Sequence, residues 1–71
     1  MVVKVDTISD FAIRKMAKNS LLLQNKQTGE TCFIHRNVFN VVNDNPELPL
    51  FRVEKNFNGH TSMWLATPMT I

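Results

Sequence analysis

The chain has 71 residues, of which 44% are hydrophobic, and a formal net charge of +2 at neutral pH. This length predicts one domain over residues 1–71 with a small core, because so short a chain buries only about 60% of the surface that it exposes when unfolded. The hydrophobic content argues against disorder, and no run approaches the roughly 18 apolar residues that span a membrane. Cys32 is the only cysteine, so no disulfide forms within the chain, and a lone thiol indicates a cytoplasmic protein.

The first 20 residues predict a short strand followed by a helix. Residues 1–5 are rich in valine, as strands often are. Thr7 and Asp10 have the spacing of a capping box, in which the later residue reaches back to the first backbone N–H. Helical spacing of apolar residues follows at Ile8, Phe11, Ala12 and Met16. The pattern therefore predicts a helix over residues 8–18, with Asn19 at its end.

Turn chemistry predicts two β-hairpins. The first joins residues 21–25 to residues 31–35, and Gly29 provides the positive φ that its turn requires. The second joins residues 50–57 to residues 60–67 through Asn58-Gly59, a strong signal for a two-residue type I′ turn. A two-residue turn fixes the register, so the predicted pairs are Phe57 with His60, Lys55 with Ser62, Val53 with Trp64 and Phe51 with Ala66.

Residues 36–44, between the hairpins, are ambiguous. Their apolar residues have helical spacing, but many are β-branched and would also suit a strand. A cap at Asn37 and a stop at residues 43–46 favour a short helix. The predicted fold is therefore α+β in the order (β)αββαββ, a small antiparallel sheet of two hairpins with one or two helices on one face.

The second hairpin has two faces of different composition. One face is aromatic at its inner end and is assigned to the core. The residues expected to be buried across the chain are Phe11, Phe33, Phe51, Val53 and Trp64. The opposite face carries Leu50, Met63 and Leu65 beside Arg52 and Glu54. This mixture is too charged for a core, so the face is predicted to be the outer one.

Catalysis, metal binding and cofactor binding are all disfavoured. Cys32, His35 and His60 are the only thiol and imidazole groups, whereas zinc takes four such ligands, or three and a water. Residues three apart on a strand face opposite sides of the sheet, which separates Cys32 from His35. No third group is placed to orient a nucleophile and its base. The prediction is a protein that is not an enzyme and has no cofactor.

The leading hypothesis is an interaction module that regulates or inhibits a larger protein and also forms homo-oligomers. Apolar and aromatic residues in excess of what one small sheet covers are typical of protein interfaces. The candidate interface consists of Leu50, Phe57, Met63, Leu65 and Met69. No membrane partner is expected.

The alternative is a small regulator that binds nucleic acid. Arg14, Lys15 and Lys18 form a basic stripe on the predicted first helix, and Arg52 and Lys55 add charge on the second hairpin. Cations contact phosphates and aromatic rings stack on bases. The competing interpretation of the same stripe is a solvated helix face.

Overall fold

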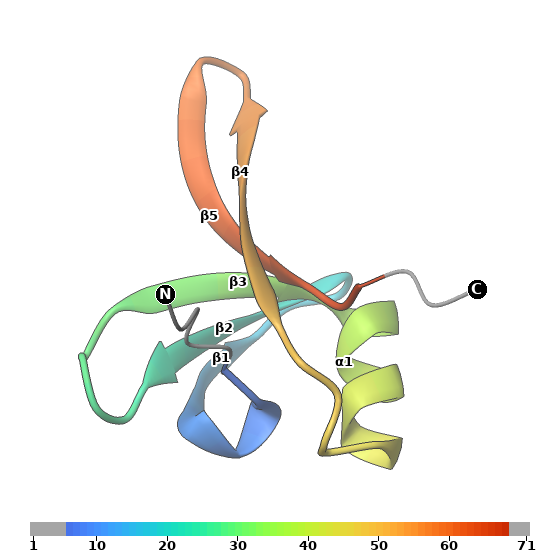
Figure 1. Cartoon of the computed structure of the whole chain (residues 1–71). Coiled ribbons are helices and arrows are strands. Elements are labelled where there is room, and N and C mark those ends of the chain that lie inside the picture. The colour runs from blue at the N-terminus through green and yellow to red at the C-terminus, as the bar shows by residue number, and fades with distance from the viewer. Residues whose placement is uncertain (1–5, 69–71) are drawn as a thin grey trace.

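The computed structural model describes residues 6–68, apart from the side chain of Phe57. Its strands are β1 (Phe11–Met16), β2 (Ser20–Asn25), β3 (Thr31–His35), β4 (Phe51–Phe57) and β5 (His60–Ala66); its helices are the 3₁₀ turn η1 (Ile8–Asp10) and α1 (Arg36–Asp44). The strands form one sheet in the order β1-β2-β3-β5-β4 (Figure 1). The fold is α+β, but β3 and β5 run parallel. The sheet is therefore mixed rather than purely antiparallel, and the predicted element order is not the observed one.

The prediction of a helix over residues 8–18 is wrong. Only η1 is helical there, and the backbone N–H of Thr7 donates to the Asp10 carboxylate over 2.9 Å, as the capping box requires. From Phe11 the chain is extended and pairs with β2. The register of this pair shifts between Ile13 and Lys15, so a bulge interrupts the alternation of side chains and leaves apolar spacings that imitate a helix.

Both predicted hairpins are present, and their turns have the expected backbone. Gly29 has φ of 78°, while Asn58 and Gly59 have φ of 49° and 82°, as a type I′ turn demands. All four predicted pairs of the second hairpin occur: Phe57 with His60, Lys55 with Ser62, Val53 with Trp64 and Phe51 with Ala66. In the first turn, the side-chain oxygen of the buried Asn25 accepts from the N–H groups of Gln27 (2.8 Å) and Thr28 (3.0 Å).

The helix predicted over residues 36–44 is confirmed as α1. It begins after His35 rather than at Asn37, and Asn45 ends it by donating its backbone and side-chain N–H groups to the Val41 carbonyl. Val42 faces inward and is fully buried. The helix therefore packs its apolar stripe against the same side of the sheet as the buried residues of β2 and β3.

The core assignment of the second hairpin is reversed. Leu50 and Leu65 are only 3% and 1% exposed, and Met63 is half-buried against the core. Phe33 and Phe51 are instead 36% and 41% exposed, whereas Phe11 is buried as predicted. The full core consists of Phe11, Leu21, Leu23, Cys32, Ile34, Val42, Leu50 and Leu65. The pairing of β5 with β3 places Leu65 beside Ile34, and this contact determines which face of the second hairpin is buried.

The chain before β1 also contacts the start of β4. Asp6 and Leu50 form an antiparallel bridge, in which the Leu50 N–H donates to the Asp6 carbonyl over 2.7 Å. The first and last strands of the sheet order are thus brought toward each other around the core. The far half of the β4–β5 hairpin extends away from the rest of the fold as an arm (Figure 1). The strand predicted over residues 1–5 lies outside the described residues.

Candidate functional site

Strand register divides the side chains of the sheet between two faces. The inner face carries the buried residues of β2, β3 and β5, such as Leu23, Ile34 and Leu65. Side chains of directly paired residues share a face, and successive residues alternate. The opposite face, called the outer face below, therefore carries Lys15, Leu22, Phe33, His35, Phe51, Val53, Lys55 and Trp64. Several side chains assigned to the core from the sequence belong to this face.

An aromatic cluster lies at the centre of the outer face. Phe33 of β3 and Trp64 of β5 are register partners, with ring centroids 5.2 Å apart and planes inclined by 32°. His35 stacks on Trp64 at 4.5 Å and 27°. Trp64 is therefore contacted by two rings of the neighbouring strand, whereas Phe33 keeps 36% of its surface exposed. Phe33 is the ring of the cluster that a ligand can reach.

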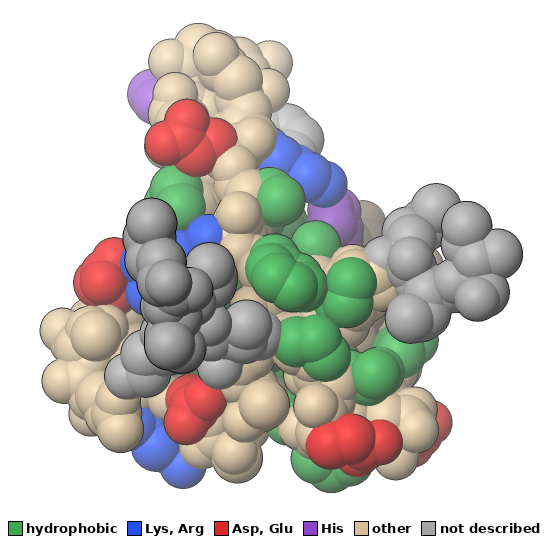
Figure 2. Space-filling view, viewed as in Figure 1, with side chains coloured by type: hydrophobic (Ala, Val, Ile, Leu, Met, Phe, Trp, Pro, Cys, Tyr) green, Lys and Arg blue, Asp and Glu red, His purple; other side chains and the backbone are tan. Residues whose placement is uncertain are grey.

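A cation is fixed beside this cluster. The Nζ atom of Lys55 lies 3.1 Å from His35 Nε2 and 5.6 Å from the centre of the Trp64 ring. An ammonium group only donates, so in this contact His35 Nε2 takes the role of acceptor. The ammonium also gains from the negative face of the indole. Figure 2 shows a basic and a histidine side chain side by side at the base of the arm, next to a hydrophobic cluster.

A groove lies on the other side of Phe33. Its volume is about 380 Å³, and its lining comes from β1, the β1–β2 turn, β2 and β3: Lys15, Met16, Ala17, Ser20, Leu22 and Phe33. Met16 is 62% exposed although it is apolar. The groove thus joins an aromatic ring and aliphatic side chains to one lysine and one serine hydroxyl.

Arg36, the first residue of α1, holds the turn that borders the groove. Its guanidinium donates to the carbonyls of Ala17 and Lys18, and its backbone N–H donates to the Asn19 carbonyl over 3.0 Å. Three consecutive carbonyls of the β1–β2 turn are therefore bound by one residue. Nothing in the sequence pattern pointed to Arg36, because its partners are distant along the chain.

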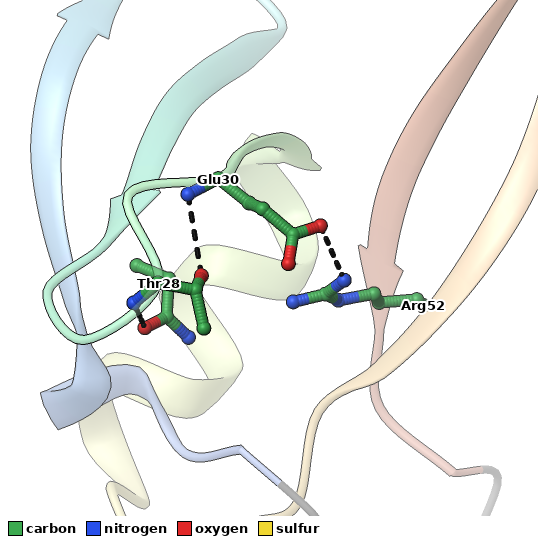
Figure 3. A network of polar contacts seen from close by, with 4 residues as sticks. Thr28, Glu30 and Arg52 are labelled. Atoms are coloured by element: carbon green, nitrogen blue, oxygen red, sulfur yellow. Dashed lines mark hydrogen bonds and ion pairs between the residues drawn. The ribbon is translucent and has the colours of Figure 1, made fainter.

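The five strands place no carboxylate on the outer face. Glu54 is the only carboxylate within the five strands, and it pairs with Met63 on the opposite face. Glu30, which precedes β3, is engaged by Arg52 of β4, with 2.8 Å between Oε2 and Nη1 (Figure 3). This hydrogen bond raises the pKa of Arg52. The Glu30 backbone N–H also donates to the Thr28 hydroxyl over 3.2 Å.

The basic residues predicted to contact nucleic acid are divided by the structure. Lys15 and Lys55 lie on the outer face, while Arg14 is exposed at the β1 bulge and Lys18 in the adjoining turn. Arg52 is on the other face, in its ion pair with Glu30. Lys15 lines the groove and Lys55 lies beside the aromatic cluster, although the helix on which Lys15 was placed does not exist.

The described residues of the predicted protein interface do not form a free surface. Leu50 and Leu65 belong to the core, and Met63 packs against it. Met69 and the side chain of Phe57 lie outside the described parts of the chain. Exposed apolar side chains of large size occur elsewhere, at Ile13, Met16, Phe33, Val41 and Phe51.

The thiol and the imidazoles are separated from one another. Cys32 is buried on the inner face, where desolvation raises the pKa of its thiol. His35 lies on the outer face, and His60 is exposed next to the Asn58-Gly59 turn. Over residues 6–68, no three His, Cys, Asp or Glu side chains are grouped so as to hold a metal ion. In the same part of the chain, neither helix has the length and apolarity that crossing a bilayer would take.

No family model, curated protein or solved structure matches the chain. Its function has to be inferred from the chemistry of its own surface. The outer face is the part of that surface where aromatic rings, cations and a groove occur together.

Proposed function

We propose that this protein binds single-stranded nucleic acid across the outer face of its sheet. The observation that carries the proposal is the exposed ring of Phe33 between two lysines, Lys15 in the groove and Lys55 beside Trp64, on a face whose strands present no carboxylate. Unpaired bases stack on aromatic rings, and each stacked base is worth about 1–3 kcal/mol. The lysines supply the charge that phosphates require.

The same geometry favours a single strand over a duplex. The Phe33 ring is set in the surface of the sheet, because neighbouring residues cover more than half of its side chain. Bases within a duplex are already stacked on each other, and their edges are reached by helices or ribbons inserted into a groove. An aromatic ring set in a sheet contacts bases that are splayed out of a strand.

The topology provides a second, independent support by analogy. The topology resembles the OB-fold arrangement in four features. These are the strand order β1-β2-β3-β5-β4, the parallel β3–β5 pair, the helix between β3 and β4, and the Asp6–Leu50 bridge. OB-folds are five-stranded, partly open barrels that bind oligonucleotides on the face of their second and third strands and with the adjoining loops. Phe33, Leu22 and Ser20 occupy the corresponding strands here. A shared topology alone does not assign a function, so the side chains of the outer face carry the argument.

Trp64, the only tryptophan, provides a built-in test because it touches Phe33. Titration with an oligodeoxythymidylate of about 12 nucleotides should quench its emission, since stacking on Phe33 changes the surroundings of the indole. Binding should weaken with salt by a slope of about 0.7 per phosphate contact in a plot of log K against log salt. A duplex of equal length is the control and should bind more weakly. Absence of binding to any single strand at low salt would refute the proposal.

Self-association is the second candidate function, within the broader hypothesis of a regulator or inhibitor that binds a protein. It is supported by the exposed Phe51 of β4 and Val41 of α1, because exposed apolar residues are enriched at interfaces. Light scattering at micromolar concentration tests it. A dimer that Phe51→Glu converts into a folded monomer would support it, and a monomer at all concentrations would remove it.

A further inference from the structure

We propose that the groove beside Phe33 is a subsite for one unpaired base of single-stranded DNA, and that this base is preferentially thymine. The inference rests on the proposed function and assigns its ligand more narrowly. It follows from the lining of the groove, from the charge around it and from the way in which its border is held.

The lining combines the groups that a nucleotide needs. Phe33 offers an exposed ring on which a base stacks, Leu22 adds apolar contact, and Lys15 supplies a cation for the phosphate. The groove thus brings an open aromatic ring and a lysine together. Arg14 and Lys18 flank the lining residues 15–17 in the sequence and are both exposed, so this segment of the chain carries positive charge that favours an anionic chain over an apolar peptide.

The apolar part of the lining favours thymine in DNA. The thymine methyl group is recognised by apolar contact, and Ala17 and Leu22 offer such contacts. Discrimination of RNA depends on polar partners for the 2′-hydroxyl. Ser20 is the only hydroxyl-bearing residue of the lining, so a ribose gains little there.

The groove is formed before any ligand arrives. Arg36 binds the carbonyls of Ala17 and Lys18, which fixes the β1–β2 turn against the start of α1. The Phe33 ring also packs against the Trp64 ring on the neighbouring strand, with 5.2 Å between their centroids. A border that is already ordered loses less conformational freedom on binding, which raises affinity for a ligand of the right shape.

The first experiment compares variants by fluorescence anisotropy with a labelled oligodeoxythymidylate of about 12 nucleotides. Phe33→Leu should weaken binding about tenfold. Phe51→Leu is the matched control, because Phe51 is similarly exposed on the same face and does not line the groove. Because it shares the outer face but not the groove, it should weaken binding less than Phe33→Leu does. Thermal melting checks that each variant is folded.

The second experiment exchanges the ligand and locates it. Oligodeoxyuridylate lacks the methyl group and should bind about fourfold more weakly than oligodeoxythymidylate, and oligouridylate should bind no better than oligodeoxyuridylate. Bromodeoxyuridine placed once in the strand and irradiated should crosslink to the tryptic peptide of residues 27–36, which contains Phe33. This assay does not depend on the stability of any variant.

The results of these experiments distinguish a failure of the proposed subsite from a failure of the proposed function. If the strand binds but Phe33→Leu and Phe51→Leu behave alike and the crosslink maps outside β1, β2 and β3, the groove is not the subsite while the proposed function stands. Equal affinity for all three oligonucleotides overturns the choice of thymine in DNA. If no oligonucleotide binds and an acidic aromatic peptide quenches Trp64 instead, both proposals are overturned.

Discussion

Lys55 of β4 reaches across the intervening strand β5 to His35 of β3, with 3.1 Å between Nζ and Nε2. On the way its ammonium lies over the Trp64 ring. One side chain therefore connects the second hairpin to the first across the outer face. It contributes both to the position of the hairpins and to the charge of the candidate site.

Lys55→Met should lower the free energy of unfolding by about 0.5–1.5 kcal/mol, because it keeps the aliphatic stem but removes the donor to His35. Denaturant titration measures the change, and the emission of Trp64 should shift because its cation is lost. Lys26→Met, at the exposed β2–β3 turn, is the control and should leave both quantities unchanged. Equal effects of the two substitutions would show that the contact with His35 contributes nothing.

Leu65→Ala should lower the free energy of unfolding by about 2–5 kcal/mol, because it leaves a cavity in the core between β5 and β3. Leu65→Glu should prevent folding, since a carboxylate would be buried without a partner. Circular dichroism with thermal melting measures both. Phe51→Ala, on the exposed side, should cost much less. A folded Leu65→Glu protein would mean that the outer face had been assigned correctly from the sequence.

Lys15→Gln should reduce the salt dependence of oligodeoxythymidylate binding by about 0.7 in the slope, the value of one phosphate contact on a single strand. Arg52→Gln removes the same charge from the other face, where Arg52 is paired with Glu30, and should leave the slope unchanged. Its effect on stability should stay below about 1 kcal/mol, because exposed ion pairs contribute little. Titration at several salt concentrations compares the two variants directly. A smaller slope for Arg52→Gln than for Lys15→Gln would contradict the placement of the site.

Cys32 should react slowly with thiol reagents in the folded protein, because burial raises the pKa of its thiol and only the thiolate attacks. A raised pKa in the folded state also links stability to pH. Below about pH 8.5 the thiol is protonated in both states and has no effect. As pH rises above this value, the unfolded state loses its proton first and stability falls. Cys32→Ala should be less stable at neutral pH but lack this part of the alkaline loss, which unfolding curves at several pH values would measure.

Local chemistry predicted a large part of the fold. Gly29 and Asn58-Gly59 each impose a backbone conformation on their own turn, so both hairpins and the register of the second follow from the sequence. The helix α1 was predicted from spacing and from the stop at Asn45. The segment from Phe11 to Met16 was misassigned because its partner strand, and not its own spacing, makes it a strand.

The candidate site depended on contacts that local patterns do not contain. Lys15 and Lys55 were recognised as candidate cations, but Phe33 and Trp64 were placed in the core. Both faces of the second hairpin are partly apolar, and only the docking of Leu65 beside Ile34 decides which of them is buried. Arg36 acquires its role from the distant β1–β2 turn in the same way.

The parallel pair of β3 and β5 has a consequence for how the protein folds. Each hairpin closes through its own short turn, an event of about 1–10 μs. The pairs Phe33–Trp64 and Ile34–Leu65 join residues far apart in the chain, so their formation must wait for closure of the long segment between β3 and β5. We therefore expect docking of the two hairpins to be the slow step, and Trp64 should report on it because it lies at the junction. Lengthening the chain between α1 and β4 should slow this step while leaving each hairpin as it is.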